Sequence, residues 1–237
     1  MLQIKNLSVK VGEKQILNQI SFDFETGKNY CILGKNGSGK SSLAMTLAGN
    51  PKYEISEGEL LLDGQNLTEM TPDERNKAGI FLTFQNIPEV PGVKLFEFLK
   101  TIYDARAEKP STFLEFKKLI EPLMAELEIE KAFLWRDLNV GFSGGEKRKI
   151  EVLQIKLLKP KYIILDEIDS GLDVNAVRQV AELLKAVNTE ENSFIVITHL
   201  FEMLQELPLE KILILEQGKI KAIGGRELMD QVRKEGF

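Results

Sequence analysis

Apolar residues repeat in three different ways along the chain, and each way predicts a different kind of element. In the first part of the sequence they alternate with polar residues, as expected for half-buried strands at Ile4–Val9, Ile20–Phe24 and Glu59–Leu62. The turn-forming pairs Gly12-Glu13 and Asp63-Gly64 mark breaks after strands. The chain is therefore predicted to begin with a β-rich segment.

Other apolar runs are short, continuous and bounded by polar residues or glycine, a pattern typical of strands buried on both faces of a parallel sheet. These runs are Tyr30–Leu33, Gly79–Phe84, Tyr162–Leu165 and Ser193–Thr198. Near the C-terminus, the turn Glu216-Gln217-Gly218 separates Lys211–Leu215 from Lys219–Ile223 and predicts a hairpin. The pattern as a whole indicates an α/β protein.

Between Leu95 and Asn139 the apolar spacing changes to three and four residues, which predicts helices. The residues of this stripe, expected to form the core of a helical subdomain, are Phe113, Phe116, Leu119, Ile120, Leu123 and Leu127. The sequence contains no internal repeat, low-complexity tract or flexible linker. We therefore predict one domain over residues 1–237, in which residues 85–159 form a helical insertion between the core segments 1–84 and 160–237.

The composition restricts the classes of function. A net charge of -5 and a pI near 5.3 argue against a nucleic-acid partner bound through its phosphates. No apolar run approaches the roughly 18 residues needed to cross a bilayer, and the first residues lack the apolar stretch of a signal peptide. We therefore expect a cytoplasmic protein without direct membrane insertion. Cys31, the only cysteine, is expected to pack in the core.

The clearest chemical motif is Gly34–Ser41, which matches the phosphate-binding pattern G-x-x-x-x-G-K-[ST]. An apolar strand precedes it and a helix capped by Gly49 follows it, a context that a chance glycine-rich turn would lack. Lys40 would reach the β and γ phosphate oxygens, and Ser41 would coordinate Mg²⁺. The predicted nucleotide-binding residues are Gly34, Lys35, Asn36, Gly37, Ser38, Gly39, Lys40, Ser41 and Ser42.

Two carboxylates follow the apolar run Tyr162–Leu165. Ligands of open α/β folds bind at the carboxyl edge of the sheet, so Asp166 is placed to hold Mg²⁺ and Glu167 to deprotonate an attacking water. A strand that simply ends at a polar turn would have the same sequence. Combined with a phosphate-binding loop, the pair favours a nucleoside triphosphatase.

A third motif, Ser143–Glu146, precedes an amphipathic helix with Ile150, Leu153 and Leu157 in register. Ser143 and Glu146 have the spacing of a capping box at a helix N-terminus. The two glycines between them leave N–H groups that are suited to a γ-phosphate. We therefore expect this segment to cap a helix and also to contact nucleotide.

Together with Phe142, this segment resembles the signature motif Leu-Ser-Gly-Gly-Gln of ATP-binding-cassette (ABC) ATPases, and it differs only at Phe142 and Glu146. Other motifs of that family occur in the family's order. Gln85 resembles the Q-loop glutamine, and His199, the only histidine, resembles the switch histidine. A segment that resembles the family's D-loop is Ser170-Gly171-Leu172-Asp173. The resemblance covers essentially the whole chain.

This resemblance implies a P-loop NTPase fold of ABC ATPase type, with an antiparallel β subdomain, a mostly parallel core sheet and a helical subdomain. ATP and Mg²⁺ are the implied cofactors. The implied catalytic residues are Glu167, His199 and Gln85. The implied Mg²⁺ ligands are Ser41, Gln85 and Asp166.

The resemblance also implies a transient, ATP-dependent, head-to-tail homodimer. In such a dimer the signature residues of one subunit act on the ATP of the other, and here they are Ser143, Gly144, Gly145 and Glu146. The family's aromatic residue that stacks on adenine would fall near Val11, where this chain has none.

Within the ABC family, three segments of the sequence are similar to the SufC subfamily, the ATPases of the SUF iron–sulfur cluster assembly system. The similar segments are Phe84–Val93, Gly141–Lys149 and Leu165–Asp173. This implies a partnership with SufB/SufD-type scaffold proteins. The alternative is the nucleotide-binding subunit of an ABC membrane transporter, whereas a clamp of the condensin kind would need heptad arms that the sequence lacks.

A partner surface is predicted around the Q-loop, at Phe84–Val93 and the helix that follows it. The apolar residues of that helix are Leu95, Phe96, Phe98 and Leu99. They have two interpretations, because the same residues could instead form the core of the helical subdomain.

Overall fold

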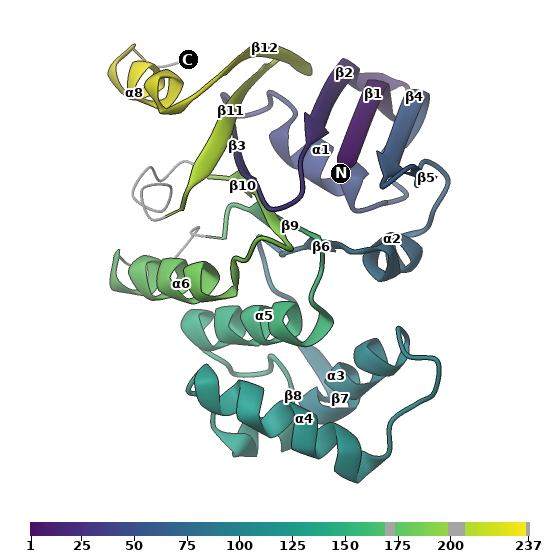
Figure 1. Ribbon diagram of the computed structural model, residues 1–237, viewed down its shortest axis with the longest axis vertical. Coiled ribbons are helices and arrows are strands. Elements are labelled where there is room, and N and C mark those ends of the chain that lie inside the picture. Colours follow the sequence, from purple (N-terminus) through teal and green to yellow (C-terminus); the bar gives the residue numbers. More distant parts are fainter. Residues whose placement is uncertain (169–173, 199–206, 236–237) are drawn as a thin grey trace. The chain divides into compact units, whose positions relative to one another are not determined.

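The computed structural model of the protein describes residues 1–168, 174–198 and 207–235 (Figure 1). The chain forms two compact units. The first, here called the core unit, comprises Met1–Thr83, Pro160–Ile168 and Asn188–Phe237, and the second, the helical unit, comprises Phe84–Lys159 and Asp169–Val187. Helix α6 (Val174–Val187) belongs to the helical unit, although it lies beyond the segment 85–159 predicted for the helical subdomain.

The core unit contains an antiparallel sheet with the strand order β2-β1-β4-β5. Its strands are β1 (Leu2–Val11), β2 (Lys14–Phe24), β4 (Glu54–Leu62) and β5 (Gln65–Asn66). β2 begins well before the predicted residue Ile20. Register shifts near Leu7 and Val9 interrupt the pairing of β1 with β2, and so they break the regular alternation on which the prediction relied.

A second sheet of six strands has the order β12-β11-β3-β10-β9-β6. The strands are β3 (Asn29–Leu33), β6 (Ile80–Leu82), β9 (Tyr162–Asp166), β10 (Ser193–Ile197), β11 (Leu209–Glu216) and β12 (Lys219–Gly224). Neighbouring strands are parallel except β11 and β12, which form the predicted hairpin. β6 is shorter than predicted, because Phe84 leaves the sheet and donates its N–H to Glu151 Oε1 at 2.9 Å.

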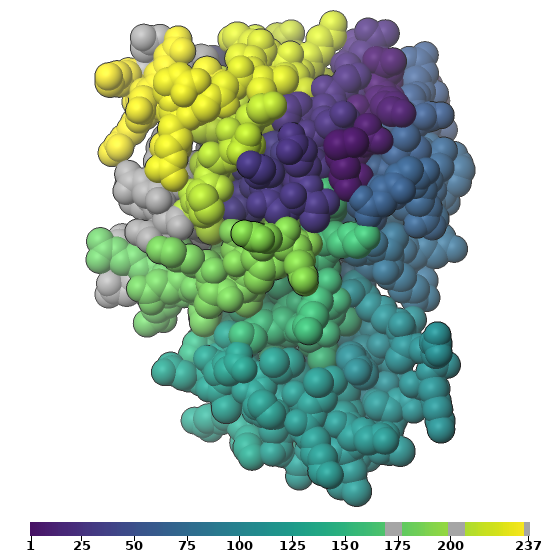
Figure 2. All heavy atoms as spheres, viewed as in Figure 1, coloured from purple at the N-terminus to yellow at the C-terminus, as the bar shows by residue number. Residues whose placement is uncertain are grey.

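Helices α1 (Lys40–Leu47), α2 (Pro72–Ala78) and α8 (Arg226–Glu235) complete the described part of the core unit. α1 packs against strands of both sheets, and Leu43 and Leu47 join the hydrophobic core that the two sheets share. Cys31 is fully buried, as predicted, and burial raises the pKa of its thiol. In the space-filling view, the C-terminal hairpin packs beside the N-terminal strands (purple), and α8 (yellow) packs against the hairpin (Figure 2).

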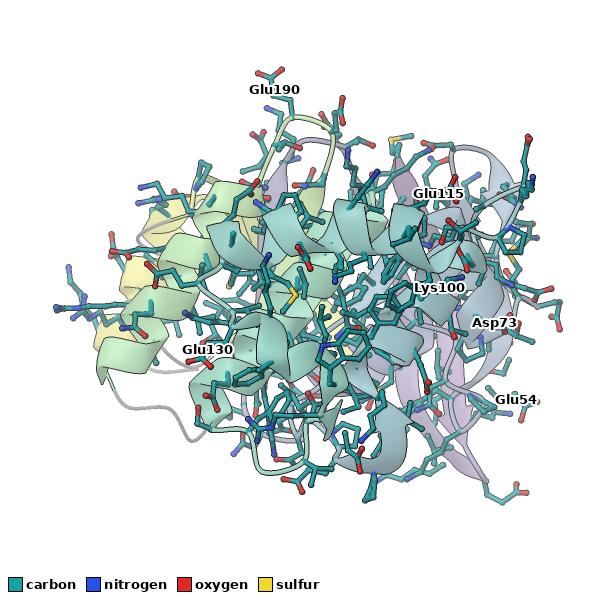
Figure 3. The ribbon with its side chains drawn as sticks, turned by 90° about the horizontal axis from the view of Figure 1, so that it is seen from below. Glu54, Asp73, Lys100, Glu115, Glu130 and Glu190 are labelled. Atoms are coloured by element: carbon teal, nitrogen blue, oxygen red, sulfur yellow. The ribbon has the colours of Figure 1, made fainter. Side chains whose placement is uncertain are left out.

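The helical unit contains α3 (Leu95–Asp104), α4 (Phe113–Glu126), the short 3-10 helix η1 (Lys131–Trp135), α5 (Gly144–Leu158) and α6. Figure 3 labels Lys100 on α3 and Glu115 on α4. Two short strands, β7 (Val90–Lys94) and β8 (Asp137–Leu138), were not predicted, because β8 has two residues and β7 contains proline and glycine. No helix within the described ranges is long and apolar enough to span a bilayer.

The apolar stripe of α4 differs in part from the prediction. The buried residues are Phe116, Ile120, Met124 and Leu127, whereas Phe113 and Leu119 are 48% and 38% exposed. Met124 takes the inward position after Ile120, because residues four apart share one face of a helix. Phe113 contacts Trp135 and Phe96, with ring centroids 6.1 and 4.8 Å apart.

Candidate functional site

The phosphate-binding loop joins β3 to α1 at the carboxyl end of a parallel strand. β3 pairs with β10 and β10 pairs with β9, so that Ile32 lies opposite Ile197, and Ile197 opposite Asp166. This register brings the loop to the same edge of the sheet as Asp166 and Glu167, where open α/β sheets bind their ligands.

Two glycines allow the path of the loop. A Cβ at Gly34 would lie 2.3 Å from Leu215 O and 2.5 Å from Ser38 Oγ. Gly39 has φ +108°, in the left-handed region, immediately before the first residue of α1. A side chain at either position would displace the backbone N–H groups that bind phosphate in such loops.

Lys40 folds back over the loop that precedes it. Its Nζ donates to Gly34 O at 2.8 Å and to Lys35 O at 3.2 Å, and the residue is buried. Burial lowers the pKa of Lys40, and the nearby Glu167 and Asp166 oppose that shift. A phosphate would be a stronger partner for this buried ammonium than the two carbonyl oxygens, because both groups would be charged.

Ser41 and Asp166 are in direct contact. Ser41 Oγ donates to Asp166 Oδ1 at 3.1 Å, and Asp166 is buried. The pKa of Asp166 is raised, mainly by burial and also by the nearby Glu167. The Ser41 hydrogen bond and Lys40 oppose this shift. Glu167 has φ +49° and donates its N–H to Ile197 O at 2.8 Å. Such left-handed residues other than glycine are strained and are frequent at functional sites.

Ser38 has a buried hydroxyl whose Oγ has no hydrogen-bond partner among the described residues. A buried polar group without a partner costs free energy, and a phosphate oxygen would supply the missing acceptor. A hollow of about 240 Å³ lies beside the loop, lined by residues 35–38 and 214–217. The loop therefore fits a ligand that carries phosphate.

The hydroxyl of Ser41 and the carboxylate of Asp166 also fit Mg²⁺, which prefers oxygen ligands and takes much of its shell from water and substrate phosphates. Over residues 1–168, 174–198 and 207–235, no group of three or more His, Cys, Asp or Glu side chains could hold a metal ion. This donor set suits an ion that is bound together with a nucleotide.

Gly218, predicted from the sequence only as a turn residue, lies against the phosphate-binding loop. It donates its N–H to Ser38 O at 2.9 Å, and its own carbonyl accepts from Asn18 N–H at 2.9 Å. Its φ is +75°, and a Cβ there would lie 2.2 Å from Ile16 O. The β11–β12 turn therefore supports the phosphate loop, a contact between distant parts of the chain that no local pattern indicates.

In the helical unit, Ser143 and Glu146 form the predicted capping box at the start of α5. Glu146 N–H donates to Ser143 Oγ at 3.3 Å, and Ser143 N–H donates to Glu146 Oε2 at 2.7 Å. This second bond lowers the pKa of the Glu146 carboxyl. A cavity of about 270 Å³ lies against the signature residues Ser143, Gly145 and Glu146.

The two departures from the usual ABC signature have structural reasons. Phe142 is buried with its ring centroid 4.6 Å from that of Phe133, and the Arg136 guanidinium lies 4.5 Å from the Phe142 centroid. A cation–π contact of this kind requires an aromatic ring. Glu146 closes the capping box, and its negative charge is favoured at a helix N-terminus.

The remaining predicted site residues are not gathered by the structure in the same way. Gln85 is exposed and belongs to the helical unit. The predicted D-loop, Ser170–Asp173, and His199 lie outside the described residues. Their roles stay predictions.

For the helix that follows the Q-loop, the structure supports the second of the two interpretations, the core of the helical subdomain. Leu95, Phe96 and Leu99 are 0%, 3% and 0% exposed, so they form the core of the helical unit rather than a free surface. α3 packs against η1, and the Phe96 ring stacks on that of Trp135 with centroids 5.2 Å apart. Phe84, at 52% exposure, keeps an accessible ring at the start of the segment.

Comparison with known proteins identifies the class. The sequence matches the ABC transporter family over residues 17–170. The fold is similar to that of a dimeric ATP-binding cassette in a post-hydrolysis state bound to ADP and Pi, with a TM-score of 0.79 and 22% identity, covering 94% of this chain and 98% of that chain. This chain therefore belongs to the ABC family and is a nucleotide-binding, ABC-type ATPase.

Relatives that match over nearly their whole length show which ABC ATPases this chain is similar to. The chain is 41% identical over 241 residues to the probable ATP-dependent transporter ycf16 of Antithamnion sp., covering 100% of this chain and 96% of the relative. It is 39% identical over 241 residues to the probable ATP-dependent transporter SufC of Escherichia coli, covering 100% and 97%. The predicted resemblance to SufC is confirmed.

Proposed function

We propose that this ATPase is Mg²⁺-dependent and couples ATP binding and hydrolysis to iron–sulfur cluster assembly on a SufB/SufD-type scaffold in the cytoplasm. The observation that supports the ATPase chemistry best is the convergence of Lys40, Ser41 and Asp166 at one edge of the core sheet. The 39% identity to SufC over the whole chain supports the proposed role in iron–sulfur cluster assembly.

The proposed chemistry uses few groups. The loop N–H groups and Lys40 bind the β and γ phosphates. Glu167 accepts a proton from the attacking water as the water oxygen bonds to the γ phosphorus, and the bond between the γ phosphorus and the β–γ bridging oxygen breaks, so that ADP leaves. Mg²⁺, held by Ser41, Asp166 and Gln85, would neutralise phosphate charge. His199 contacts the γ-phosphate, and the signature segment of a second copy completes the site.

Glu167→Gln tests the assignment of the base. The amide still hydrogen-bonds water but cannot accept its proton, so we expect ATP affinity to stay within about twofold and kcat to fall by about 100-fold or more. Fluorescent-nucleotide titration and phosphate release measure the two quantities. Glu190→Gln, which changes an exposed carboxylate that points outward (Figure 3), is the matched control. Parental turnover in Glu167→Gln would show that another group is the base.

A second candidate function follows from the relatives' names, which describe probable ATP-dependent transporters. In that case the partner would be a membrane protein rather than a cluster scaffold. A pull-down from lysate with the parental chain as bait separates the two, with Val93→Asp as a bait altered in the predicted docking segment. Recovery of scaffold proteins by the parental bait alone supports the proposal, and recovery of a polytopic membrane protein would replace it with the transporter function.

A further inference from the structure

Two buried side chains of opposite charge fasten the Q-loop backbone to helix α5. Arg148 and Glu151 are 5% and 4% exposed, and Arg148 Nη1 lies 2.6 Å from Glu151 Oε2. Glu151 Oε1 accepts from Phe84 N–H at 2.9 Å. Arg148 donates to Phe84 O at 2.7 Å and to Gln85 O at 3.2 Å. All four residues belong to the helical unit.

Stability alone does not account for this ion pair. Burying two charges costs solvation free energy, and apolar residues of similar volume often hold a helix equally well. Burial raises the pKa of the Glu151 carboxyl, and Arg148 only opposes that shift. An apolar pair could not bind the N–H and C=O of Phe84 and the C=O of Gln85, because these groups need an acceptor and donors. The pair therefore serves the backbone at Gln85.

Two further contacts connect the same segment to the region of the signature motif. Lys147, in the first turn of α5, forms an ion pair with Glu89 at 2.9 Å. Asn139 Nδ2 donates to Pro88 O at 2.9 Å. The Q-loop and the helix that begins with the signature motif are thus joined at several points along the segment 84–89.

We propose that Arg148 and Glu151 are positioning residues that hold Gln85 in a fixed relation to the signature helix, so that a nucleotide-dependent displacement of one is transmitted to the other. The inference rests on the proposed roles of Gln85 and of the signature segment in ATP hydrolysis. The pair acts through the Gln85 backbone and makes no contact with reacting atoms in this mechanism.

The test replaces the pair by apolar residues of similar size, Arg148→Met together with Glu151→Leu, so that neither charge is left buried alone. We expect the variant to stay folded, as followed by fluorescence of the single tryptophan Trp135, because Phe84 and Gln85 are exposed and water can bind their backbone groups once the pair is gone. We expect ATP Kd to stay within about twofold and kcat to fall about 10- to 100-fold, because Gln85 is no longer held in place. Parental kcat in the folded double variant would overturn the proposal.

Lys156→Met is the matched control. Lys156 also lies on α5, and its ion pair with Glu126 of α4 does not involve the Q-loop. Its Kd, kcat and unfolding curve should all match those of the parental chain. If the double variant does not fold, Arg148→Lys serves in its place. Lysine keeps the charge but not the fork that reaches two carbonyls, so kcat should again fall while Kd is retained.

Two measurements separate positioning from general damage. Gln85→Ala should lower kcat in the parental chain but add little in the double variant, and effects that multiply would overturn the proposal. Hydrogen exchange of the nucleotide-free protein should be faster at the Phe84 amide once its bond to Glu151 is lost, and unchanged protection would also overturn it. The exchange measurement needs no hydrolysis, so failure of the ATPase assignment and failure of this inference give different results.

Discussion

At single positions, the phosphate-binding loop depends on backbone geometry as much as on its charged side chains. Lys40 and Ser41 are the residues proposed to bind phosphate and Mg²⁺, and Gly218 holds the loop by donating its N–H to Ser38 O. The Ser38 hydroxyl, buried and lacking a partner among the described residues, lies in the same segment. The loop is therefore built around a group that a ligand would complete, and its shape is set partly from the β11–β12 turn.

Gly218→Ala should weaken nucleotide binding. Its new Cβ would lie 2.2 Å from Ile16 O, so the turn must shift and Ser38 O loses its donor. Losing a hydrogen bond to a buried group costs about 1–3 kcal/mol, and we expect ATP affinity to fall about tenfold. Gly64→Ala is the control, because Gly64 also has positive φ in a turn but has open space around its Cβ. Fluorescent-nucleotide titration measures both, and equal affinities would contradict the supporting role of Gly218.

The sequence points to candidate site residues where they lie within one local segment. Lys40 and Ser41 share a motif, and the carboxylate of Asp166 follows an apolar strand. Arg148 and Glu151 were missed, because Lys147-Arg148-Lys149 resembles a solvated run of charges. Arg148 is buried where it meets Glu151 and the backbone of Phe84, and Phe84 is 64 positions away in the chain.

For helices and strands, periodicity predicted the existence of most elements but not always their ends or inner faces. The buried strands β3, β9 and β10 were found because both faces of a parallel strand are apolar. In α4 the inward line ends on Met124 and Leu127, a choice made by packing and not by local hydrophobicity. The pair β7 and β8 had no local signal at all, since it forms only when two distant segments meet.

The connection between α3 and α4 gives a pH-dependent prediction. Asp104 pairs with Lys100 and accepts from Ser111 N–H at 2.9 Å and Ser111 Oγ at 2.7 Å. Burial raises the pKa of Asp104, but these bonds outweigh burial and lower the pKa to about 2. The unfolded value is about 4, so the unfolded chain binds more protons between these pH values. Asp104 therefore stabilises the fold at neutral pH, and this contribution is lost as the pH falls from about 4 to about 2.

Asp104→Asn should accordingly be less stable than the parental chain at pH 7, and the difference should shrink as the pH falls toward 3. Urea unfolding followed by Trp135 fluorescence reports on this unit, because Trp135 is the only tryptophan. Lys100→Met keeps the Ser111 bonds and should lose only part of the stability. A stability difference that does not change between pH 7 and pH 3 would contradict this account.

For the whole molecule, each chain supplies one phosphate-binding loop in its core unit and one signature segment in its helical unit. An ATPase that uses both on one nucleotide, as we propose, pairs the loop of one copy with the signature of another. Two identical copies related by a two-fold axis would then form two equivalent sites. Assembly should therefore depend on ATP and should be most stable when hydrolysis is blocked.

This predicts that Glu167→Gln forms a dimer with ATP and Mg²⁺ and is a monomer without nucleotide. Adding Ser143→Arg should return it to a monomer while ATP affinity stays within about twofold, because a large cation would occupy the surface that meets the partner's ATP. Thr112→Arg is the control: Thr112 also begins a helix with a capping box, so its loss costs a similar ~1 kcal/mol without altering the signature. Light scattering coupled to gel filtration reads out the mass. A dimer that survives Ser143→Arg but is lost in Thr112→Arg would place the contact surface elsewhere on the helical unit.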